Sequence, residues 1–564
     1  MTFTALDWAV VIAYFVATTW IGARLAGKQS TIRDFFLGGR RLPWLAVAGS
    51  IIATEISAVT FVSVPFVVFK DGGDFTYLQL GVFGALFARL IVGYVLIPAY
   101  YKQEIYSPYD YMGNRLGPAV RKMTTALFTL GGILAQSARV YLTAIVLELL
   151  LADSVYGPLE AATGISTLVW AIWTIGLVAV VWTLLGGIST VIWTDVILFA
   201  VFGIGAVTAI VVIAMRLDGG FQEILEVGNA AGKFKFFDFD PDPTKTFTIW
   251  TAAIASTWFM TGIYGTDQLM AQRMFCCKNE ADARKAIIFS WFGQVVTAAV
   301  MLVGVGLFAY YRAFPMEGAA ADLFAENPER IFPIFIIDEM PAGLTGLIVA
   351  GIFAAAISSL DSILAALSQT VMSAFVLKGS AERSPEDERL QVRRGRWLVV
   401  GWGVVLCAAA QGVGVVREWY PSLLDLALAL AAYTSGGLLA GFLIAFLPLR
   451  VDGYGFLWGA PLSVLLVFAI VWHQPWALIA CLLVGTVLLA TWVWLGVRRR
   501  VTSLPEKTAL LILAIGLVVL VQQKGTIGGV NLAFPWCAPA GSIMAFGIAI
   551  LLGNRRPASE KDAA

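Results

Sequence analysis

The chain has 564 residues, of which 59% are hydrophobic and only 13% are charged, and its mean hydropathy is +0.82. Because soluble domains carry roughly 25% charged residues, this composition excludes an ordinary soluble enzyme or binding domain. The net charge of +1 is uninformative, and we expect no nucleic-acid partner. The five cysteines show no metal-ligand spacing beyond the adjacent pair Cys276 and Cys277. We therefore expect an integral membrane protein without a disulfide framework or a metal cluster.

Apolar segments recur along the whole chain, each with the length of an α-helix that crosses a hydrocarbon core of about 30 Å. About fifteen spans are expected on this criterion. They are 6–27, 43–69, 76–101, 121–151, 164–186, 190–216, 248–271, 286–312, 342–377, 395–416, 420–447, 454–472, 475–497, 507–523 and 538–553. The first span follows Met1 closely, without a basic segment or a clear cleavage site, so we interpret it as a retained helix rather than a signal peptide.

The charges between the spans predict the orientation of the protein. If the N-terminus lies outside, the cytoplasmic loops are the basic ones, whereas an opposite loop such as 313–341 is acidic. The basic residues expected in cytoplasmic loops are Lys28, Arg33, Arg40, Arg41, Lys102, Arg115, Arg121, Lys122, Arg273, Lys278, Arg284, Lys285, those of 378–396, Arg498, Arg499, Arg500, Arg555 and Arg556. The positive-inside rule therefore favours a multi-pass protein of the cell membrane with its N-terminus outside and its C-terminus in the cytoplasm.

Several ionisable residues are expected inside the spans, where each costs about 2.5–3.5 kcal/mol at a helix centre. They are Glu55, Arg89, Arg139, Glu148, Asp195, Asp361 and Asp425. Such a residue either pairs with an opposite charge on a neighbouring helix or serves a ligand.

One of these charges, Asp361, stands among hydroxyl groups. Ala355, Ser358, Ser359 and Ser362 follow the i, i+3, i+4, i+7 spacing of one helical face. Hydroxyl, carbonyl and carboxylate oxygens can replace the water shell of a hard cation. The alternative is helix packing, in which small residues allow close approach and serines bond to their own backbone. The carboxylate favours a cation or a proton, because it contributes nothing to close packing.

Two spans contain signals for a broken helix. The second span has Glu55, Ser57 and Thr60 near its middle, and in the seventh Gly262 and Gly265 flank Ile263 and Tyr264. These spans lie five apart, so they occupy corresponding places in two runs of five helices with opposite orientation. Paired interruptions of this kind are typical of an inverted-repeat transporter with a central binding site.

Four stretches then carry a resemblance to a known family. They are "DFFLGGRRLPWLAVAGSIIATEISA" (34–58), "GGISTVIWTDVILF" (186–199), "YGTDQLMAQRMFCCKNEADARKA" (264–286) and "FAAAISSLDS" (353–362). With them the chain resembles the solute:sodium symporter family, which includes the sodium/galactose, sodium/sialic acid and sodium/proline symporters. The resemblance implies an all-α polytopic membrane protein with a LeuT-like five-plus-five inverted repeat.

The same resemblance divides the chain into five parts. They are an extra N-terminal helix with a cytoplasmic loop (1–42), a first repeat (43–216), an extracellular loop (217–247), a second repeat (248–447), and additional C-terminal helices with a short tail (448–564). We expect the C-terminal helices to serve packing or assembly.

The resemblance also implies the ion sites. A common sodium site would use backbone carbonyls of the first broken helix and a carbonyl with two hydroxyls of the eighth repeat helix, which fall on Ala53, Ile56, Ala355, Ser358 and Ser359. A second sodium site would fall on Asp195, Ser358, Asp361 and Ser362. The family commonly has a hydroxyl where Asp361 stands, so this carboxylate either tightens a second sodium ion or binds a proton.

The substrate site is expected in the same central region. Thr60, Met260 and Gln294 occupy sugar-binding positions of the sodium/galactose symporters, but one is short and one is apolar, so a galactose-type site is doubtful. Arg139 lies on the helix from which an arginine binds the substrate carboxylate in sialic acid symporters; pairing with Glu55 or Glu148 is the alternative. The residues expected to line the cavity are Thr60, Phe61, Phe83, Arg139, Met260, Tyr264 and Gln294.

These residues predict a sodium-coupled symporter that imports a small organic acid, such as sialic acid or a monocarboxylate, or a sugar or polyol, by alternating access. The partners are then the substrate, one or two Na⁺ ions and the lipid bilayer, with no organic cofactor and no enzymatic activity; the oligomeric state stays open. A proton-coupled transporter is the first alternative, and a cation channel, for which no filter-like repeat is present, is the second. A lone histidine, His473, and the absence of a phosphate-binding glycine loop argue against a pump or an enzyme.

Overall fold

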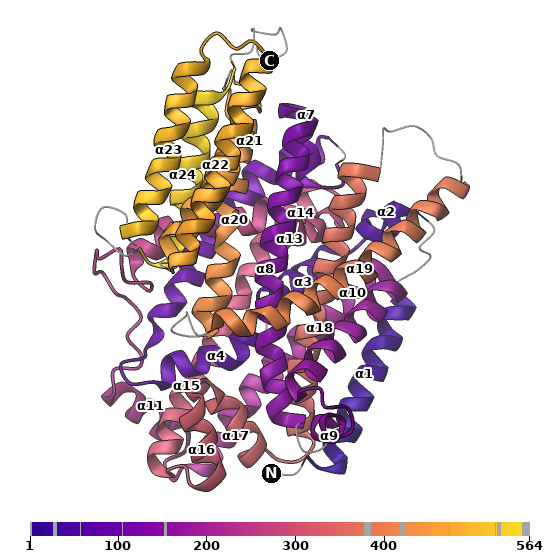
Figure 1. Cartoon of the computed structure of the whole chain (residues 1–564). Helices are drawn as coiled ribbons and strands as arrows, with labels where there is room; N and C mark the ends of the chain where they lie inside the picture. The colour runs from indigo at the N-terminus through magenta and orange to yellow at the C-terminus, as the bar shows by residue number, and fades with distance from the viewer. Residues whose placement is uncertain are drawn as a thin grey trace.

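The computed structural model describes residues 3–25, 31–56, 58–103, 105–151, 155–376, 385–417, 423–449, 451–472, 474–524, 526 and 532–554. All named elements among these residues are helices (Figure 1). Eleven of them, or runs of them, are long and apolar enough to cross a membrane, and shorter apolar helices lie at Trp44–Glu55, Leu430–Phe446 and Phe456–Val471. The prediction of an all-α polytopic membrane protein is therefore confirmed.

Helices α1 to α11 precede the second broken span. Their bounds are α1 (Ala5–Leu25), α2 (Ile32–Leu37), α3 (Trp44–Glu55), α4 (Ala58–Phe69), α5 (Ala85–Ile91), α6 (Ile97–Tyr101), α7 (Pro108–Leu116), α8 (Pro118–Leu151), α9 (Gly157–Thr163), α10 (Thr167–Arg216) and α11 (Gly220–Ala230). Helix α10 contains two predicted spans, which meet at Gly187, whose φ of 54° and ψ of −161° kink the helix.

The second half begins with the other broken span. Its helices are α12 (Thr257–Gly265), α13 (Gln268–Phe275), α14 (Glu280–Phe289), α15 (Gly293–Ala313), α16 (Gly318–Glu326), α17 (Ile331–Glu339), α18 (Leu344–Val371), α19 (Pro385–Val416) and α20 (Leu423–Phe446). Helix α18 is the most buried span, with 89% of its apolar window inside the molecule, and it packs on α10, α1 and α8. A polar group on α18 therefore faces protein rather than lipid.

Both predicted helix breaks exist, although one lies later than expected. Helix α3 ends at Glu55, and Ile56 has non-helical dihedral angles (φ −82°, ψ 87°) before α4 begins at Ala58. The second break falls at Thr266 and Asp267, after Gly265, whereas Ile263 and Tyr264 remain helical within α12. The Asp267 carboxylate accepts a hydrogen bond from the backbone N–H of Leu269 and thereby caps α13. The new helix therefore starts at this cap and not at Gly262 and Gly265.

One predicted position is wrong. Arg273 was expected in a cytoplasmic loop, but it lies on α13 and is fully buried. The seventh predicted span was ended too early, because its second half carries polar residues that pack inside the protein instead of facing lipid.

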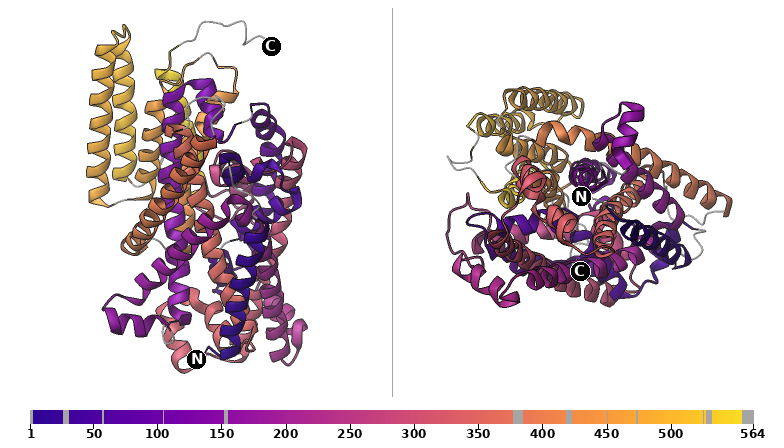
Figure 2. Two further views of the ribbon diagram at one scale, coloured as in Figure 1. Left: turned by 90° about the vertical axis from the view of Figure 1, so that its right-hand side faces the viewer. Right: turned by 90° about the horizontal axis from the view of Figure 1, so that it is seen from below.

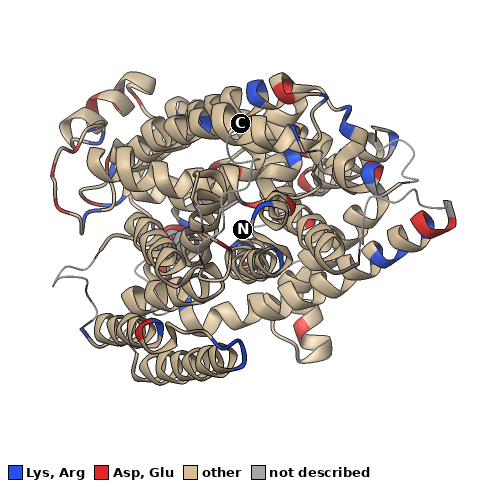
Figure 3. Ribbon diagram, turned by 90° about the horizontal axis from the view of Figure 1, so that it is seen from above, with Lys and Arg blue, Asp and Glu red and all other residues tan. Residues whose placement is uncertain are grey.

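The C-terminal helices form a layer that packs on α20. They are α21 (Phe456–Val471), α22 (Pro475–Arg498), α23 (Leu504–Lys524) and α24 (Cys537–Leu552). Helices α21 and α24 pack on α20, whereas α22 and α23 stand as an exposed pair at the edge of the molecule (Figure 2). Charged residues occupy mainly helix ends and loops when the molecule is viewed from the end where α24 finishes (Figure 3).

Several residues named in the sequence analysis lie outside what the structure describes. They are Lys28, Ser57, His473, the basic residues of 378–384 and 555–556, and the side chain of Asp425 on α20. Eleven of the expected spans are long enough, among the described residues, to cross a membrane. The two broken spans are divided into shorter helices, and the described apolar helices of the expected spans 420–447 and 454–472 are also shorter, at Leu430–Phe446 and Phe456–Val471.

Candidate functional site

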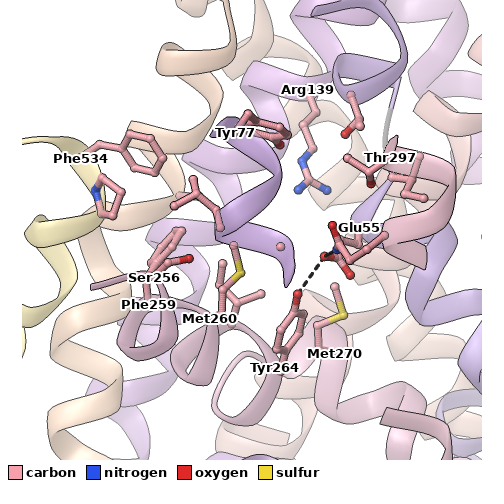
Figure 4. Close-up of a pocket in the computed structure, with 18 residues that line it drawn as sticks. Glu55, Tyr77, Arg139, Ser256, Phe259, Met260, Tyr264, Met270, Thr297 and Phe534 are labelled. Carbon is pink, nitrogen blue, oxygen red and sulfur yellow. Dashed lines mark hydrogen bonds between the residues drawn. The ribbon is translucent and has the colours of Figure 1, made fainter. Parts of the chain in front are cut away.

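A cavity of about 140 Å³ lies between the two broken helices (Figure 4). Its walls combine apolar and aromatic side chains with a few polar groups, as binding sites for small molecules generally do. The lining residues are Glu55, Ile56, Thr60, Tyr77, Leu80, Gly81, Arg139, Ser256, Phe259, Met260, Ile263, Tyr264, Met270, Gln294, Thr297, Ala431, Phe534 and Pro535. Five of the seven residues expected to line the cavity are among them, namely Thr60, Arg139, Met260, Tyr264 and Gln294.

The carboxylate of Glu55 organises one wall of this cavity. It forms an ion pair with the fully buried Arg89 of α5. Its Oε1 atom also accepts hydrogen bonds from the Tyr264 hydroxyl (2.9 Å) and from the Gln294 amide (3.1 Å). The Arg89 guanidinium in turn lies 4.3 Å from the centre of the Tyr264 ring and donates to the Ser290 hydroxyl at 2.9 Å. The negative charge of Glu55 is therefore compensated by the protein itself.

The guanidinium of Arg139 has no such partner. Arg139 projects from α8 into the cavity, as Figure 4 shows, and its Nη1 atom donates one hydrogen bond, of 3.2 Å, to the Thr54 carbonyl. Within the described residues it forms no ion pair, because Glu55 pairs with Arg89 and Glu148 accepts from the Thr167 hydroxyl. The alternative in which Arg139 pairs with Glu55 or Glu148 is therefore not what the structure contains. A guanidinium at a cavity wall with unused donors suits a carboxylate.

A second cavity, of about 70 Å³, shares Arg139, Ile263, Met270 and Ala431 with the first. It is bordered by Thr266 and Asp267, at the break between α12 and α13, and by Gln136, whose buried amide oxygen bonds to no described residue. Arg139 lines both cavities. Its side chain thus stands between a larger and a smaller chamber.

Some cavity residues were missed from the sequence, and two predicted ones lie elsewhere. Phe61 stacks on Phe202, and Phe83 lies near Phe236 and Phe237, so neither lines the cavity. Thr297 could have been found, because it follows Gln294 by three residues and shares its helical face. Phe534 and Pro535 carried no signal, since they come from the segment before α24.

The residues predicted for the common sodium site are all buried and come from two helices in contact, α3 and α18. Ala53 and Ile56 lie where α3 ends, where carbonyl groups lack intrahelical partners. Serine hydroxyls in membrane helices usually bond to the carbonyl four residues earlier, as Thr370 does with Ala366 on α18. Neither Ser358 nor Ser359 does so: Ser358 donates to Asp195, and the Ser359 hydroxyl bonds to no described residue. These oxygens fit a small cation better than a packing role.

The residues predicted for a second sodium site also lie together, but a guanidinium lies among them. Arg273 Nη2 donates to Asp195 Oδ2 at 3.1 Å and to Ser362 Oγ at 2.5 Å. Ser362 in turn donates to Asp361 Oδ1 at 3.3 Å. The sequence analysis missed this contact because it placed Arg273 in a loop.

Comparison with known proteins supports a transporter. Residues 35–462 match the sodium:solute symporter family. The chain is 28% identical over 465 residues to human sodium-coupled monocarboxylate transporter 1, covering 81% of this chain and 72% of that protein. It is also 28% identical over 450 residues to the sodium-dependent multivitamin transporter of Oryctolagus cuniculus, covering 78% and 66%.

A solved structure shares the fold. It is the substrate-bound outward-open state of a Na⁺-coupled sialic acid symporter, with a TM-score of 0.72 and 24% sequence identity, covering 98% of this chain and 100% of that one. The LeuT-like helical architecture expected from the resemblance is thereby confirmed. The family match extends over both broken helices, the hydroxyl face of α18 and all residues of the cavity except Phe534 and Pro535. The chain belongs to the sodium:solute symporter family and is a sodium-coupled solute symporter.

Proposed function

We propose that this symporter imports a small monocarboxylate together with sodium by alternating access. The observation that carries the proposal is Arg139, a guanidinium that faces the cavity and forms no ion pair with a described residue. The substrate carboxylate would bind to this side chain, and its short body would pack on apolar walls such as Phe259, Met260 and Ile263. The printed names of the relatives, which include sodium-coupled monocarboxylate transporters, agree with this substrate class.

The walls of the cavity argue against a galactose-like sugar. A sugar would need many hydrogen-bonding groups, whereas most of the lining side chains are apolar or aromatic. The polar groups of Glu55 already accept bonds from Arg89, Tyr264 and Gln294. A compact acid satisfies Arg139 without requiring further polar partners.

We propose that sodium binds at Ala53, Ile56, Ala355, Ser358 and Ser359. Ile56 would link the ion to the substrate, because it lies in the predicted sodium site and also lines the cavity. An ion that holds the Ile56 carbonyl would fix the break between α3 and α4 and hence one wall of the cavity. Sodium and substrate would then raise each other's affinity by the same factor, as thermodynamic linkage requires.

The two inverted repeats, 43–216 and 248–447, would move relative to each other around this site, with the N-terminus outside the cell. One sodium ion that moves inward down a tenfold concentration gradient supplies about 1.4 kcal/mol of free energy for solute import. That is enough to concentrate a coupled solute about tenfold before any contribution from the membrane potential.

A ligand screen tests the substrate assignment. Thermal stabilisation of the purified protein in sodium would be measured with monocarboxylates, amino acids, sialic acid, sugars and polyols. Short monocarboxylates should stabilise the wild type, and Arg139→Gln should abolish this effect while sodium alone still stabilises the variant. Arg139→Lys is the matched control, because it keeps the positive charge but lacks the planar guanidinium that can donate two parallel hydrogen bonds. In this variant monocarboxylates should still stabilise the protein, but less than in the wild type. Stabilisation by a neutral sugar that persists in Arg139→Gln would contradict the proposal.

A further inference from the structure

The smaller cavity, of about 70 Å³, leads away from the substrate site. Along α8 its lining residues run from Arg139 back to Phe128, a distance of about 16 Å at 1.5 Å per residue. Along α20 they run from Ala431 to Leu438, towards the end of that helix. The start of α8 and the end of α20 lie on the side that the positive-inside rule assigns to the cytoplasm. The smaller cavity therefore lies on a route from the substrate site to the cytoplasm.

The walls of the smaller cavity suit water and a polar solute. The amide oxygen of Gln136 is buried there and bonds to no described residue, and the Asp267 carboxylate accepts the backbone N–H of Leu269. One water molecule occupies about 30 Å³ of liquid volume and needs two to four polar partners. A chamber of this size and polarity can therefore hydrate a small carboxylate that leaves Arg139.

Aromatic rings close this chamber on the side nearest the cytoplasm. Phe128 lines the cavity, and the ring of Tyr109, on α7, packs on it with 5.6 Å between ring centres. The Tyr109 hydroxyl accepts a 3.3 Å hydrogen bond from the backbone N–H of Gln268, the first residue of α13. Helix α7 lies at the end of the molecule where α24 finishes (Figure 1). Tyr109 thus connects the floor of the chamber to the second broken helix.

Two glutamine side chains join α13 to α18 at the same level. Gln268 Nε2 donates to Gln369 Oε1 at 2.7 Å. The Tyr106 carbonyl accepts from Gln369 Nε2 at 2.7 Å and from Gln268 Nε2 at 3.4 Å. Gln268 and Gln369 are 0% and 2% exposed, and Gln369 lies six residues, or about 9 Å, beyond the cavity residue Ile363 on α18. Helices α13 and α18 and the loop before α7 therefore meet beyond the chamber.

This contact between amides has the features of one that can open. Gln268 directly follows Asp267, at the break between α12 and α13, so a rotation of α13 about the break moves the Gln268 side chain relative to α18. In the present arrangement Gln268 Oε1 is buried and bonds to no described residue. Leaving a buried polar atom unsatisfied costs free energy, which water returns when the contact opens. The hydrogen bonds hold the closed arrangement, and the unsatisfied oxygen keeps it close in free energy to an open one.

We propose that Gln268 and Gln369, joined on the Tyr106 carbonyl, form the cytoplasmic gate of this symporter, and that the smaller cavity is the chamber through which the carboxylate leaves. This inference rests on the proposed function and adds the residues that control release. The gate separates when α13 turns about the break that precedes it. Water then enters the chamber, and the carboxylate passes from Arg139 to the cytoplasm.

Access to the chamber from the cytoplasm tests the inference. Ala135→Cys places a thiol in the chamber wall, and the wild type is the control for background labelling because its five cysteines are buried. A charged, membrane-impermeant methanethiosulfonate is applied to inside-out and right-side-out membrane vesicles in sodium without substrate. Gln369→Leu removes the amide at similar volume. It should accelerate labelling of Ala135→Cys from the cytoplasmic side by about fivefold or more, as expected for the net loss of one hydrogen bond.

Gln522→Leu is the matched control for this substitution. Gln522 is also a buried glutamine, and its amide donates to the carbonyls of Trp472 and Gln474 in the C-terminal layer. This variant should leave the labelling rate unchanged. If Gln369→Leu does not reach the membrane, Gln369→Asn replaces it, because an amide shorter by one methylene cannot hold both partners. The same acceleration is expected.

An unchanged rate of cytoplasmic labelling in the Gln369 variant would overturn the inference. Acceleration from the external side alone, or an equal acceleration by Gln522→Leu, would overturn it as well. The labelling needs no substrate. A failure of monocarboxylates to stabilise the protein would therefore contradict the proposed function, while accelerated labelling would still support the gate.

Discussion

The Tyr264 hydroxyl donates a 2.9 Å hydrogen bond to Glu55 Oε1 and thereby joins the two broken helices directly. Glu55 is the last residue of α3, and Tyr264 lies one residue before the end of α12, so the bond connects the two interruptions of the fold. The bond borders the cavity, and the Arg89 guanidinium lies against both partners. The Tyr264–Glu55 bond therefore links the two breaks in this structure.

Removing the charge of Glu55 should damage this connection. Glu55→Gln leaves the buried guanidinium of Arg89 without its ion-pair partner, and breaking such a pair costs about 3–5 kcal/mol when both groups are buried. Because Glu55 retains 22% side-chain exposure, we expect a cost at or below the lower end of that range. The melting temperature should fall, and monocarboxylate stabilisation should be lost. Tyr264→Phe, which keeps the ring beneath Arg89, should have the smaller effect, and an unchanged melting temperature in Glu55→Gln would contradict the role of the pair.

Ser359→Ala should weaken sodium binding at least tenfold. The hydroxyl of Ser359 forms no bond with a described residue, so its loss removes a proposed ion ligand without disturbing a helix bond. Thr370→Val on the same helix is the control, because the Thr370 hydroxyl bonds to the Ala366 and Leu367 carbonyls. The sodium concentration that gives half-maximal thermal stabilisation checks the prediction. Equal sodium affinities in the two variants would argue against the common site.

Gly81→Ala should raise the KM for the carboxylate. A Cβ atom at Gly81 would lie 1.9 Å from Gln294 Oε1, so the Gln294 side chain would have to move away from Glu55 and across the cavity wall. Gly401→Ala is a suitable control, because a Cβ atom there meets nothing within 4 Å. The measurement is the concentration dependence of initial uptake. If the two variants have the same KM, the Gly81 wall does not contribute to the substrate site.

Gly459→Ala should lower stability without changing substrate affinity. Its Cβ atom would lie 2.5 Å from the Ala545 carbonyl oxygen, so α21 and α24 would be forced apart, and overpacking of this kind costs about 1–3 kcal/mol. Gly547→Ala on α24 meets nothing within 4 Å and should be neutral or slightly stabilising. Thermal unfolding of both variants distinguishes these outcomes. A changed KM in Gly459→Ala would show that the C-terminal layer takes part in binding.

The sequence alone predicted much of this architecture, because hydrophobic length identifies spans and glycine or polar residues within them identify breaks. It located Glu55, Asp195 and Asp361 as charges needing an explanation, since their cost in a membrane is large. It could not pair them. Arg273 was predicted in a loop because polar residues near the end of an apolar segment usually mark the end of a span. Only the packing of α13 inside the protein shows that Arg273 forms a hydrogen bond with Asp195. Phe534 was equally invisible, because it reaches the cavity from a segment more than 230 residues beyond Gln294 in the chain.

The sequence also did not show whether Arg139 forms an ion pair. Two partners, Glu55 and Glu148, were available within the spans, and local spacing does not say which cation each carboxylate meets. The structure pairs Glu55 with Arg89 from another helix and Glu148 with the Thr167 hydroxyl. That Arg139 forms no ion pair with a described residue is thus a consequence of tertiary packing.

Uptake of a radiolabelled monocarboxylate into proteoliposomes tests the central claim most directly. The ligand is the best acid from the thermal screen, and the external salt is sodium, choline, or choline with an inward proton gradient. We predict that the label accumulates above its external concentration only with the inward sodium gradient and that Arg139→Gln removes this accumulation. Equal uptake in sodium and choline, or accumulation driven by protons in the absence of sodium, would contradict sodium-coupled carboxylate symport.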